Sequence, residues 1–145
     1  MTEQRMERVS DDVRLRVGTD VESIDEVAAA VRRFGDRYVS RVYTAHEVRC
    51  SGGTGAAAAP GLAARFAAKE ATLKVLRPDG HRVPTWRSIE VLRHTDGWCE
   101  MRLTDEAAEL ARQAGLGELA VSLSHGAGVG MATVIGMCAA GGAGS

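Results

Sequence analysis

Two acidic side chains near the start of the chain have the spacing of a divalent-cation site. Asp20 and Glu22 alternate along residues 14–23, RLRVGTDVES, and this spacing places both carboxylates on one face of a β-strand. Gly18 shares that face and leaves room for a ligand to approach the backbone. Carboxylate oxygens suit Mg²⁺, which usually keeps a substrate phosphate in its coordination shell. A solvated strand end that leads into a helix would explain the same two acids without a ligand.

A third acid, Glu70, lies in the alanine-rich stretch RFAAKEATLK, residues 65–74, which predicts a helix. The apolar residues that fall on the same side of this helix are Leu62, Phe66 and Leu73. We therefore expect the carboxylate to point toward the core, where it needs a neutralising partner such as a metal ion shared with the two strand acids. The alternative is an ordinary ion pair between Glu70 and Lys74, one turn later, with the glutamate reaching out to solvent.

The elements that must position these acids have clear boundary signals. Ser23 and Glu26 have the spacing of a capping box, and apolar residues recur at helical intervals until Gly35, so a helix follows the first strand. Thr44 and Glu47 repeat the capping-box spacing and predict a second, short helix. The apolar face of the first strand carries Leu15, Val17, Thr19 and Val21.

The rest of the chain alternates between strand and helix signals. Residues 50–61, CSGGTGAAAAPG, predict a surface loop. The turn at Asp96 and Gly97 separates two strand-like runs and predicts a hairpin, and Thr104 starts a further helix. Residues 119–140 predict two strands, the second apolar enough for a central position in the sheet. The predicted fold class is α+β, with a largely antiparallel sheet packed with helices.

Composition limits the possible functions. The chain has 145 residues, 45% of them hydrophobic, which is enough for one domain with a single core. A net charge of -1 gives no field that would attract nucleic acid or a membrane surface. The three cysteines lack the spacing of a zinc site or a disulfide framework, so we expect a cytoplasmic protein. We expect a flexible polar leader over residues 1–13, the folded domain over 14–138 and a disordered tail over 139–145.

Three motifs, in this order, resemble a known family. VGTDVESI, RFAAKEATLK and VSLSH, followed by an apolar strand, are similar to the motifs of the 4'-phosphopantetheinyl transferases, specifically the short holo-acyl-carrier-protein synthase type. The resemblance runs from Val17 to Ile135. A G-x-D motif followed by F-x-x-K-E-A-x-x-K is specific, because helix and strand constraints alone do not produce the pair.

The resemblance implies a reaction and an assembly. Members of this family transfer the 4'-phosphopantetheine arm of coenzyme A to a serine of an apo carrier protein, in a Mg²⁺-dependent reaction that releases adenosine 3',5'-bisphosphate. Short members assemble as homotrimers with active sites between subunits. The carrier, an acidic protein, belongs to fatty acid, polyketide or peptide synthesis, and the sequence leaves open which of these it is.

The resemblance also implies roles for particular residues. Asp20 and Glu70 would bind the metal, with Glu22 as a third ligand, because longer members of the superfamily carry D-x-E at this position. The catalytic residues would be Asp20, Glu70 and Lys74, with Glu70, directly or through a metal-bound water, as the best-placed base for the serine proton. The residues expected to contact coenzyme A are Arg65, Lys74, Ser124 and His125, with His125 reaching the nucleotide phosphate across a subunit interface.

The chain departs from the family at the surface expected to dock the carrier. Glu26 stands where short members usually carry an arginine, so docking would shift to neighbours such as Arg32 and Arg33, or the preferred carrier would differ. Two alternatives in other classes stay open. One is a non-catalytic trimer that binds coenzyme A or the carrier, and the other is an unrelated metal-dependent enzyme that acts on a different phosphate ester.

Overall fold

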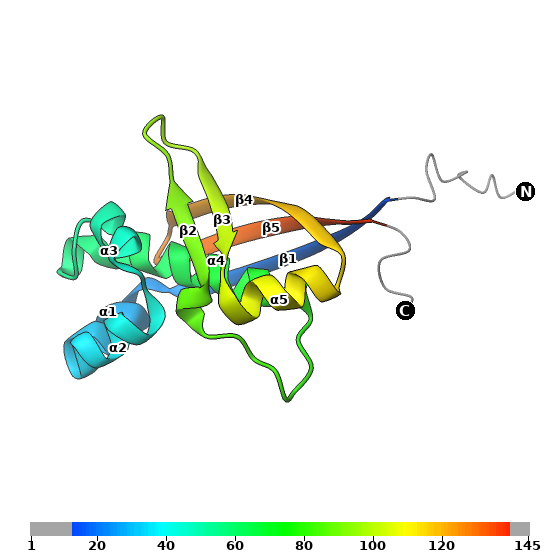
Figure 1. The fold of residues 1–145 in the computed structure, drawn as a ribbon. Coiled ribbons are helices and arrows are strands. Elements are labelled where there is room, and N and C mark those ends of the chain that lie inside the picture. The colour runs from blue at the N-terminus through cyan, green and yellow to red at the C-terminus, as the bar shows by residue number, and fades with distance from the viewer. Residues whose placement is uncertain (1–12, 140–145) are drawn as a thin grey trace, which may run out of the picture.

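One antiparallel sheet organises residues 13–139, the part of the chain that the computed structural model describes (Figure 1). Its five strands lie in the order β1-β5-β4-β3-β2. The strands are β1 (Val13–Ser23), β2 (Ile89–Arg93), β3 (Cys99–Leu103), β4 (Leu116–Gly126) and β5 (Val129–Ala139). The predicted α+β class is confirmed, and β5 lies between β1 and β4, as its apolar sequence predicted.

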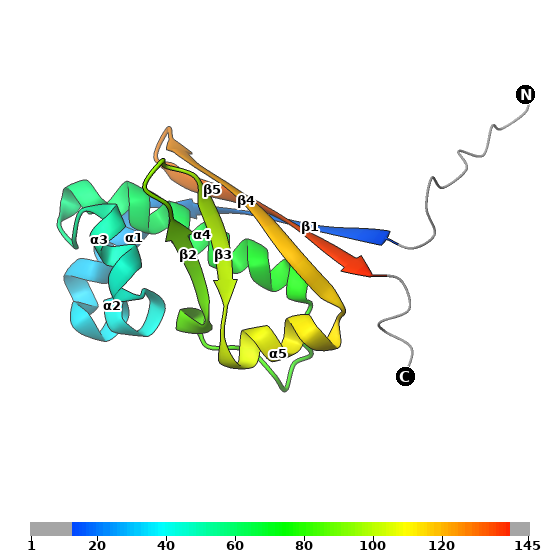
Figure 2. The same ribbon diagram turned by 45° about the horizontal axis from the view of Figure 1, so that its top comes forward.

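Helices cover one face of this sheet and one of its ends. The α-helices are α1 (Ile24–Phe34), α2 (Asp36–Val42), α3 (Ala45–Ser51), α4 (Ala59–Leu76) and α5 (Asp105–Gln113). Short 3-10 helices occupy Ala56–Ala58 and Trp86–Ser88. Helix α4 packs along the sheet, α1 to α3 gather at one end, and α5 lies near the other end (Figures 1 and 2). No helix within the described range is both long and apolar enough to cross a membrane.

Two glycines let α4 lie directly on the strands. A β-carbon on Gly18 of β1 would be 2.1 Å from the carbonyl oxygen of Ala71, and one on Gly130 of β5 would be 2.4 Å from the amide nitrogen of Ala64. Real β-carbons do not come this close to backbone atoms, so larger residues would push the helix away. Asp20 and Glu22, which alternate with Gly18, therefore lie on the face that α4 covers.

Helix α4 is buried on almost every side, which corrects the predicted apolar stripe. Its fully buried residues include Leu62, Val75 and the charged Lys69, whereas Phe66 and Leu73 are only half-buried. Glu70 is half-buried as well, so its carboxylate lies at the edge of the core and not within it. The period of apolar residues could not reveal this, because half of the buried residues of this helix are small alanines that lie all around it.

The opposite face of the sheet is apolar and uncovered. Val17 of β1 and Ile135 of β5 are paired in register, and their side chains are 65% and 43% exposed. The other exposed apolar residues on β1 and β5 are Leu15, Val21, Met131 and Met137. Since monomeric proteins rarely expose large contiguous apolar patches, this face has the character of an association surface.

Most predicted boundaries are confirmed. Ser23 accepts a hydrogen bond from the Glu26 amide, Gly35 ends α1, and Thr44 forms the predicted capping box of α3. The predicted loop over residues 50–61 is wrong in extent, because α3 includes its first two residues and α4 begins at Ala59. Helix α2 was not predicted. The leader and tail lie outside the described residues, except for Val13 and Ala139, which are paired strand residues.

Candidate active site

The three predicted acids lie near one another where β1 passes under α4, and their charges interact. Burial raises the pKa of Glu22 to about 7, and the neighbouring carboxylate of Asp20 and the negative charges of Glu70 and Glu26 add to this shift. Burial also raises the pKa of Glu70, and the charge of Asp20 contributes, whereas Lys74 opposes it. Asp20 therefore interacts with both glutamates, and the cluster favours a bound cation or proton.

Lys74 is the cation that pairs with this cluster, but it contacts only one of the two carboxylate oxygens of Asp20. Its ammonium donates to the carbonyl oxygen of Thr19 at 2.6 Å and to Asp20 Oδ1 at 3.3 Å. Asp20 Oδ2 is buried and has no hydrogen-bond partner within residues 13–139. The alternative ion pair between Glu70 and Lys74 is absent from the described part of the chain, where Lys74 pairs with Asp20 instead.

The free oxygen of Asp20 and the raised pKa values fit a divalent cation bound by few protein ligands. Within residues 13–139, no three His, Cys, Asp or Glu side chains converge closely enough to hold a metal ion by themselves. Mg²⁺ accepts such a site, because it usually binds one or two carboxylates and fills its shell with water and substrate phosphate. The residues present thus suit Mg²⁺ better than a metal that needs a closed protein cage.

The other predicted residues line a separate cavity of 320 Å³. Arg65, Ser124 and His125 contribute to its wall, together with Arg93 at the end of β2. Arg65 is only 7% exposed; its Nη1 donates to the Gly61 carbonyl at 3.1 Å, and its buried Nε has no partner among the described residues. A buried guanidinium with a free donor, beside another arginine and a histidine, is suited to bind an anion such as phosphate.

The two groups of residues lie on opposite flanks of α4. Glu22, Gly130 and His125 occupy one row across β1, β5 and β4 and point to the same face. Because Gly130 lies beneath Ala64 of α4, the helix separates Glu22 from His125. The cavity that holds His125 is lined neither by Lys74 nor by any of the three acids, Asp20, Glu22 and Glu70. Within one chain, the acid cluster and the cavity that holds His125 are therefore apart from each other. They form the two halves of the predicted site.

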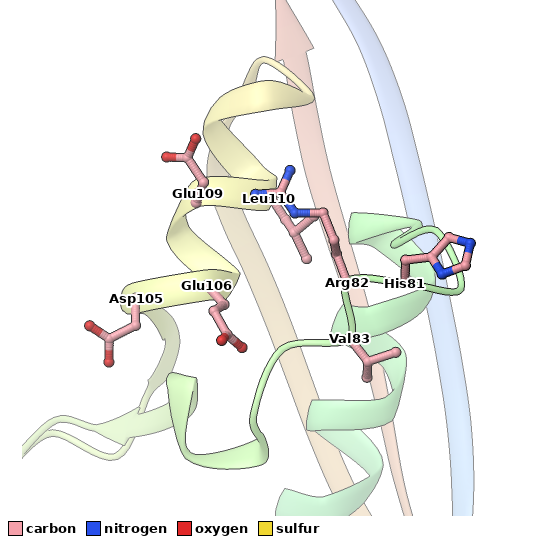
Figure 3. A pocket seen from close by; sticks show the side chains of 7 residues that line it. All are labelled: His81, Arg82, Val83, Asp105, Glu106, Glu109 and Leu110. Atoms are coloured by element: carbon pink, nitrogen blue, oxygen red, sulfur yellow. The ribbon is translucent and has the colours of Figure 1, made fainter.

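A different cavity, of 480 Å³, lies between α5 and the loop that follows α4 (Figure 3). Its lining residues are His81, Arg82, Val83, Asp105, Glu106, Glu109 and Leu110. Arg82 donates to Gln113 Oε1 at 3.2 Å, which ties this loop to α5. None of the predicted site residues contributes to this cavity, so it is not part of the predicted site.

Sequence reasoning missed a buried ion pair next to the site. Lys69, which precedes Glu70, and Glu47 of α3 are both fully buried, with Lys69 Nζ 2.8 Å from Glu47 Oε1. Burial lowers the pKa of Lys69, while the charge and hydrogen bond of Glu47 oppose this change. The only sequence signal was Glu47 in its capping box, and nothing in that spacing connects it with Lys69.

Comparisons with known proteins identify the family. The model of the 4'-phosphopantetheinyl transferase superfamily matches residues 16–124. The holo-[acyl-carrier-protein] synthase of Herpetosiphon aurantiacus is 39% identical over 130 residues, which cover 85% of this chain and 98% of that protein. The protein of the same name from Chloroflexus aurantiacus is 40% identical over 130 residues, covering 81% of this chain and 94% of that one.

Solved structures agree with these relatives. The Chronobacterium ammoniagenes ACPS-CoA complex has a TM-score of 0.72 and 29% identity, covering 85% of this chain and 96% of that chain. The Mycobacterium tuberculosis acyl carrier protein synthase has a TM-score of 0.63 and 32% identity, covering 83% and 94%. The resemblance stated from the sequence motifs is confirmed, and the chain belongs to the 4'-phosphopantetheinyl transferase superfamily.

Proposed function

We propose that this protein is a holo-acyl-carrier-protein synthase. It transfers the 4'-phosphopantetheine arm of coenzyme A to a serine hydroxyl of an apo carrier protein and releases adenosine 3',5'-bisphosphate. The observation that carries the proposal is the Asp20, Glu22 and Glu70 cluster, in which only Asp20 forms an ion pair, with Lys74, within residues 13–139. The relatives named above are holo-acyl-carrier-protein synthases, and one solved neighbour is a complex with CoA.

The site residues have different roles in phosphoryl transfer. Asp20 and Glu70 would hold Mg²⁺, which would supply the positive charge that a reacting pyrophosphate needs. Glu22 is not kept as a third ligand, because no three such side chains converge closely enough within residues 13–139. Lys74, whose side chain is 54% exposed beside Asp20, binds and orients a phosphate oxygen. Glu70 accepts the serine proton as the serine oxygen bonds to phosphorus and the pyrophosphate oxygen leaves. The raised pKa of Glu70 makes its carboxylate a better proton acceptor than a solvated one.

The second half of the site binds the nucleotide end of coenzyme A. Arg65 has a buried donor without a partner, and it shares its cavity with Ser124 and His125. A nucleotide phosphate in this cavity would receive charge-assisted hydrogen bonds from the guanidinium. The ring N–H of His125 adds a second donor.

The active form is a homotrimer, with each site shared between two copies. Helix α4 separates the two halves within one chain, so a single subunit does not bring them to one ligand. The exposed apolar face of β1 and β5 supplies a surface that association would bury. His125 of one copy would then reach a coenzyme A held by Asp20 and Glu70 of the next copy.

The carrier docks on the basic surface formed by α1 and α2. Arg37 and Arg41 border a hollow of 390 Å³ with Tyr38 and Phe34, and the Phe34 ring is 51% exposed. A basic rim around an exposed aromatic ring suits an acidic partner helix. Glu26 lies on α1 near the acid cluster and works against such a partner.

Intact-protein mass spectrometry of apo carrier proteins tests the reaction. The carriers are incubated with this protein, coenzyme A and Mg²⁺, and a parallel sample contains EDTA. The expected result is a mass gain of one phosphopantetheine that EDTA abolishes. If carriers of fatty acid, polyketide and peptide synthesis all stay unmodified while coenzyme A still raises the melting temperature, the protein is a non-catalytic binding protein.

A further inference from the structure

The buried ion pair of Glu47 and Lys69 makes hydrogen bonds to the free edge of β2. Strand β2 is the last strand of the sheet, so one of its edges has no neighbouring strand. Lys69 Nζ donates to the Ile89 carbonyl at 2.5 Å, and Glu47 Oε2 accepts from the Val91 amide at 2.9 Å. Alternate residues of a strand present their backbone groups to the same edge. Two side chains, from α3 and α4, thus satisfy backbone groups that would otherwise need a further strand.

The remaining hydrogen bonds of the pair reach the N-cap residue of α3 and the 3-10 helix before β2. Glu47 Oε1 also accepts from the Thr44 amide at 2.9 Å, and Lys69 Nζ donates to the Trp86 carbonyl at 3.0 Å. Every charged atom of the pair therefore has at least one partner. Apolar replacements of a buried ion pair are often no less stable than the pair, so stability alone does not explain two fully buried charges. A requirement to hold the elements that the pair joins in a defined arrangement does explain them.

The elements that the pair connects are the walls of the cavity that holds Arg65 and His125. Helix α3 contributes Cys50 and Ser51 to that cavity, helix α4 contributes Arg65, and β2 contributes Arg93. Arg65 is one helical turn before Lys69, so both extend from the same flank of α4.

A neighbouring contact reinforces the connection. The Arg93 amide donates to His46 Nε2 at 3.1 Å, and His46 directly precedes Glu47 on α3. Successive side chains of α3 thus hold the same edge of β2 that ends in the cavity wall.

We propose that Glu47 and Lys69 are a positioning pair for this cavity. Their ion pair fixes α4 against α3 and β2, and this holds the guanidinium of Arg65 where a phosphate of coenzyme A binds. The pair does not touch the ligand; it acts through Arg65 and the cavity walls. The inference rests on the proposed function, because it takes coenzyme A as the ligand of the cavity.

The test replaces the pair by neutral residues of similar length. In the double variant Glu47→Gln with Lys69→Met, the glutamine keeps an acceptor for the Val91 amide and no uncompensated charge is buried. We expect KM for coenzyme A and its calorimetric Kd to rise about 10-fold or more, because small displacements of binding groups have effects of this size. KM for the carrier should stay unchanged. A general loss of folded protein would instead lower the apparent kcat and leave both KM values as they were.

A matched control removes an exposed pair with the same charges. Glu109 and Arg112 form an ion pair on α5, and the double variant Glu109→Gln with Arg112→Met should keep wild-type constants. If the Glu47 and Lys69 double variant does not fold, Lys69→Arg is tested instead, because it keeps the positive charge but changes the length and shape of the side chain. We expect KM for coenzyme A to rise less than the roughly 10-fold expected for the double variant.

The outcomes separate the inference from the proposed function. If the wild-type protein transfers phosphopantetheine but a folded pair variant binds coenzyme A with wild-type constants, the positioning role is wrong and the function stands. If the wild-type protein neither binds coenzyme A nor modifies a carrier, the proposed function fails and the inference fails with it.

Discussion

Gly18 of β1 lies directly beneath Ala71 of α4, so close that a β-carbon on the glycine would stand 2.1 Å from the alanine carbonyl oxygen. The same β-carbon would be 3.0 Å from Cβ of Lys74. This contact sets the distance between the strand that carries Asp20 and the helix that carries Glu70. The glycine of the G-x-D motif is therefore required by packing, and the expectation that it leaves room for a ligand is wrong, because α4 fills that space.

We predict that Gly18→Ala destabilises the domain and weakens Mg²⁺ binding. The backbone oxygen cannot move aside as a side chain could, so the helix must shift, at a cost of about 1–3 kcal/mol. Thermal melts with and without Mg²⁺ measure both effects. Gly80→Ala is the matched control, because a β-carbon there would meet nothing within 4 Å. Equal melting temperatures for the two variants would contradict the close approach of α4.

Replacing Glu70 by glutamine should abolish transfer without unfolding the protein. The amide keeps the shape of the side chain but can neither accept the serine proton nor neutralise a metal, so turnover should fall about 100-fold or more. Because the pKa of Glu70 is raised, removing its charge should leave the melting temperature unchanged or higher. Carrier mass spectrometry gives the rate, and Glu109→Gln on the exposed surface of α5 serves as control. Near-wild-type turnover in Glu70→Gln would refute the assigned role.

The acid cluster could be predicted from the sequence because each of its parts follows from local geometry. Alternation along β1 places Asp20 and Glu22 on one face. The same alternation could not say which face of β1 the helices cover, since Val17 and its apolar neighbours look like a core face. The close contact of Gly18 with α4 decides this and leaves the apolar face exposed.

The buried ion pair could not be predicted, because it depends on how α3, α4 and β2 pack together. Lys69 stands among alanines, outside the apolar side predicted from Leu62, Phe66 and Leu73, in a helix that proves to be buried on almost every side. Glu47 has a complete local explanation as the last residue of a capping box. Only the tertiary contact between the two shows that these charges are buried.

The stability of the metal-free protein should depend on the protonation of Glu22. An acid whose pKa rises from 4.5 to about 7 on folding binds its proton more tightly in the folded state. Its stabilising contribution is therefore complete below pH 4.5 and is lost as the pH rises through about 7. We expect Glu22→Gln in EDTA to melt increasingly above the wild type over this range.

Melting curves between pH 4.5 and 8 measure this difference, with Glu118→Gln as an exposed control. Saturating Mg²⁺ should reduce the difference, because a bound cation neutralises the cluster. Melting temperatures of wild type and Glu22→Gln that stay parallel across the range would show that Glu22 does not titrate near neutral pH.

Glu26→Arg should improve the use of an acidic carrier. The change reverses a negative charge on α1 and extends the basic surface that includes Arg37. Exposed ion pairs contribute about 0.2–1 kcal/mol, so KM for the carrier should fall by a factor of roughly 1.4 to 5 at low salt. Arg37→Glu should raise it by a similar factor, and KM for coenzyme A should not change in either variant. If neither variant alters KM for the carrier or its salt dependence, the carrier docks elsewhere.

Subunit mixing tests whether each site is shared between copies. Asp20→Asn removes one half of the site and His125→Ala removes the other, so each homotrimer should be inactive. If the halves come from neighbouring copies, dissociating and reassembling an equal mixture should restore about a quarter of the wild-type sites, because half of the copies can supply each intact half. Ile135→Asp, on the uncovered face of the sheet, should prevent association, and adding it to either variant should prevent the recovery. If the mixture is no more active than the two variants assayed separately, both halves of the site belong to one chain.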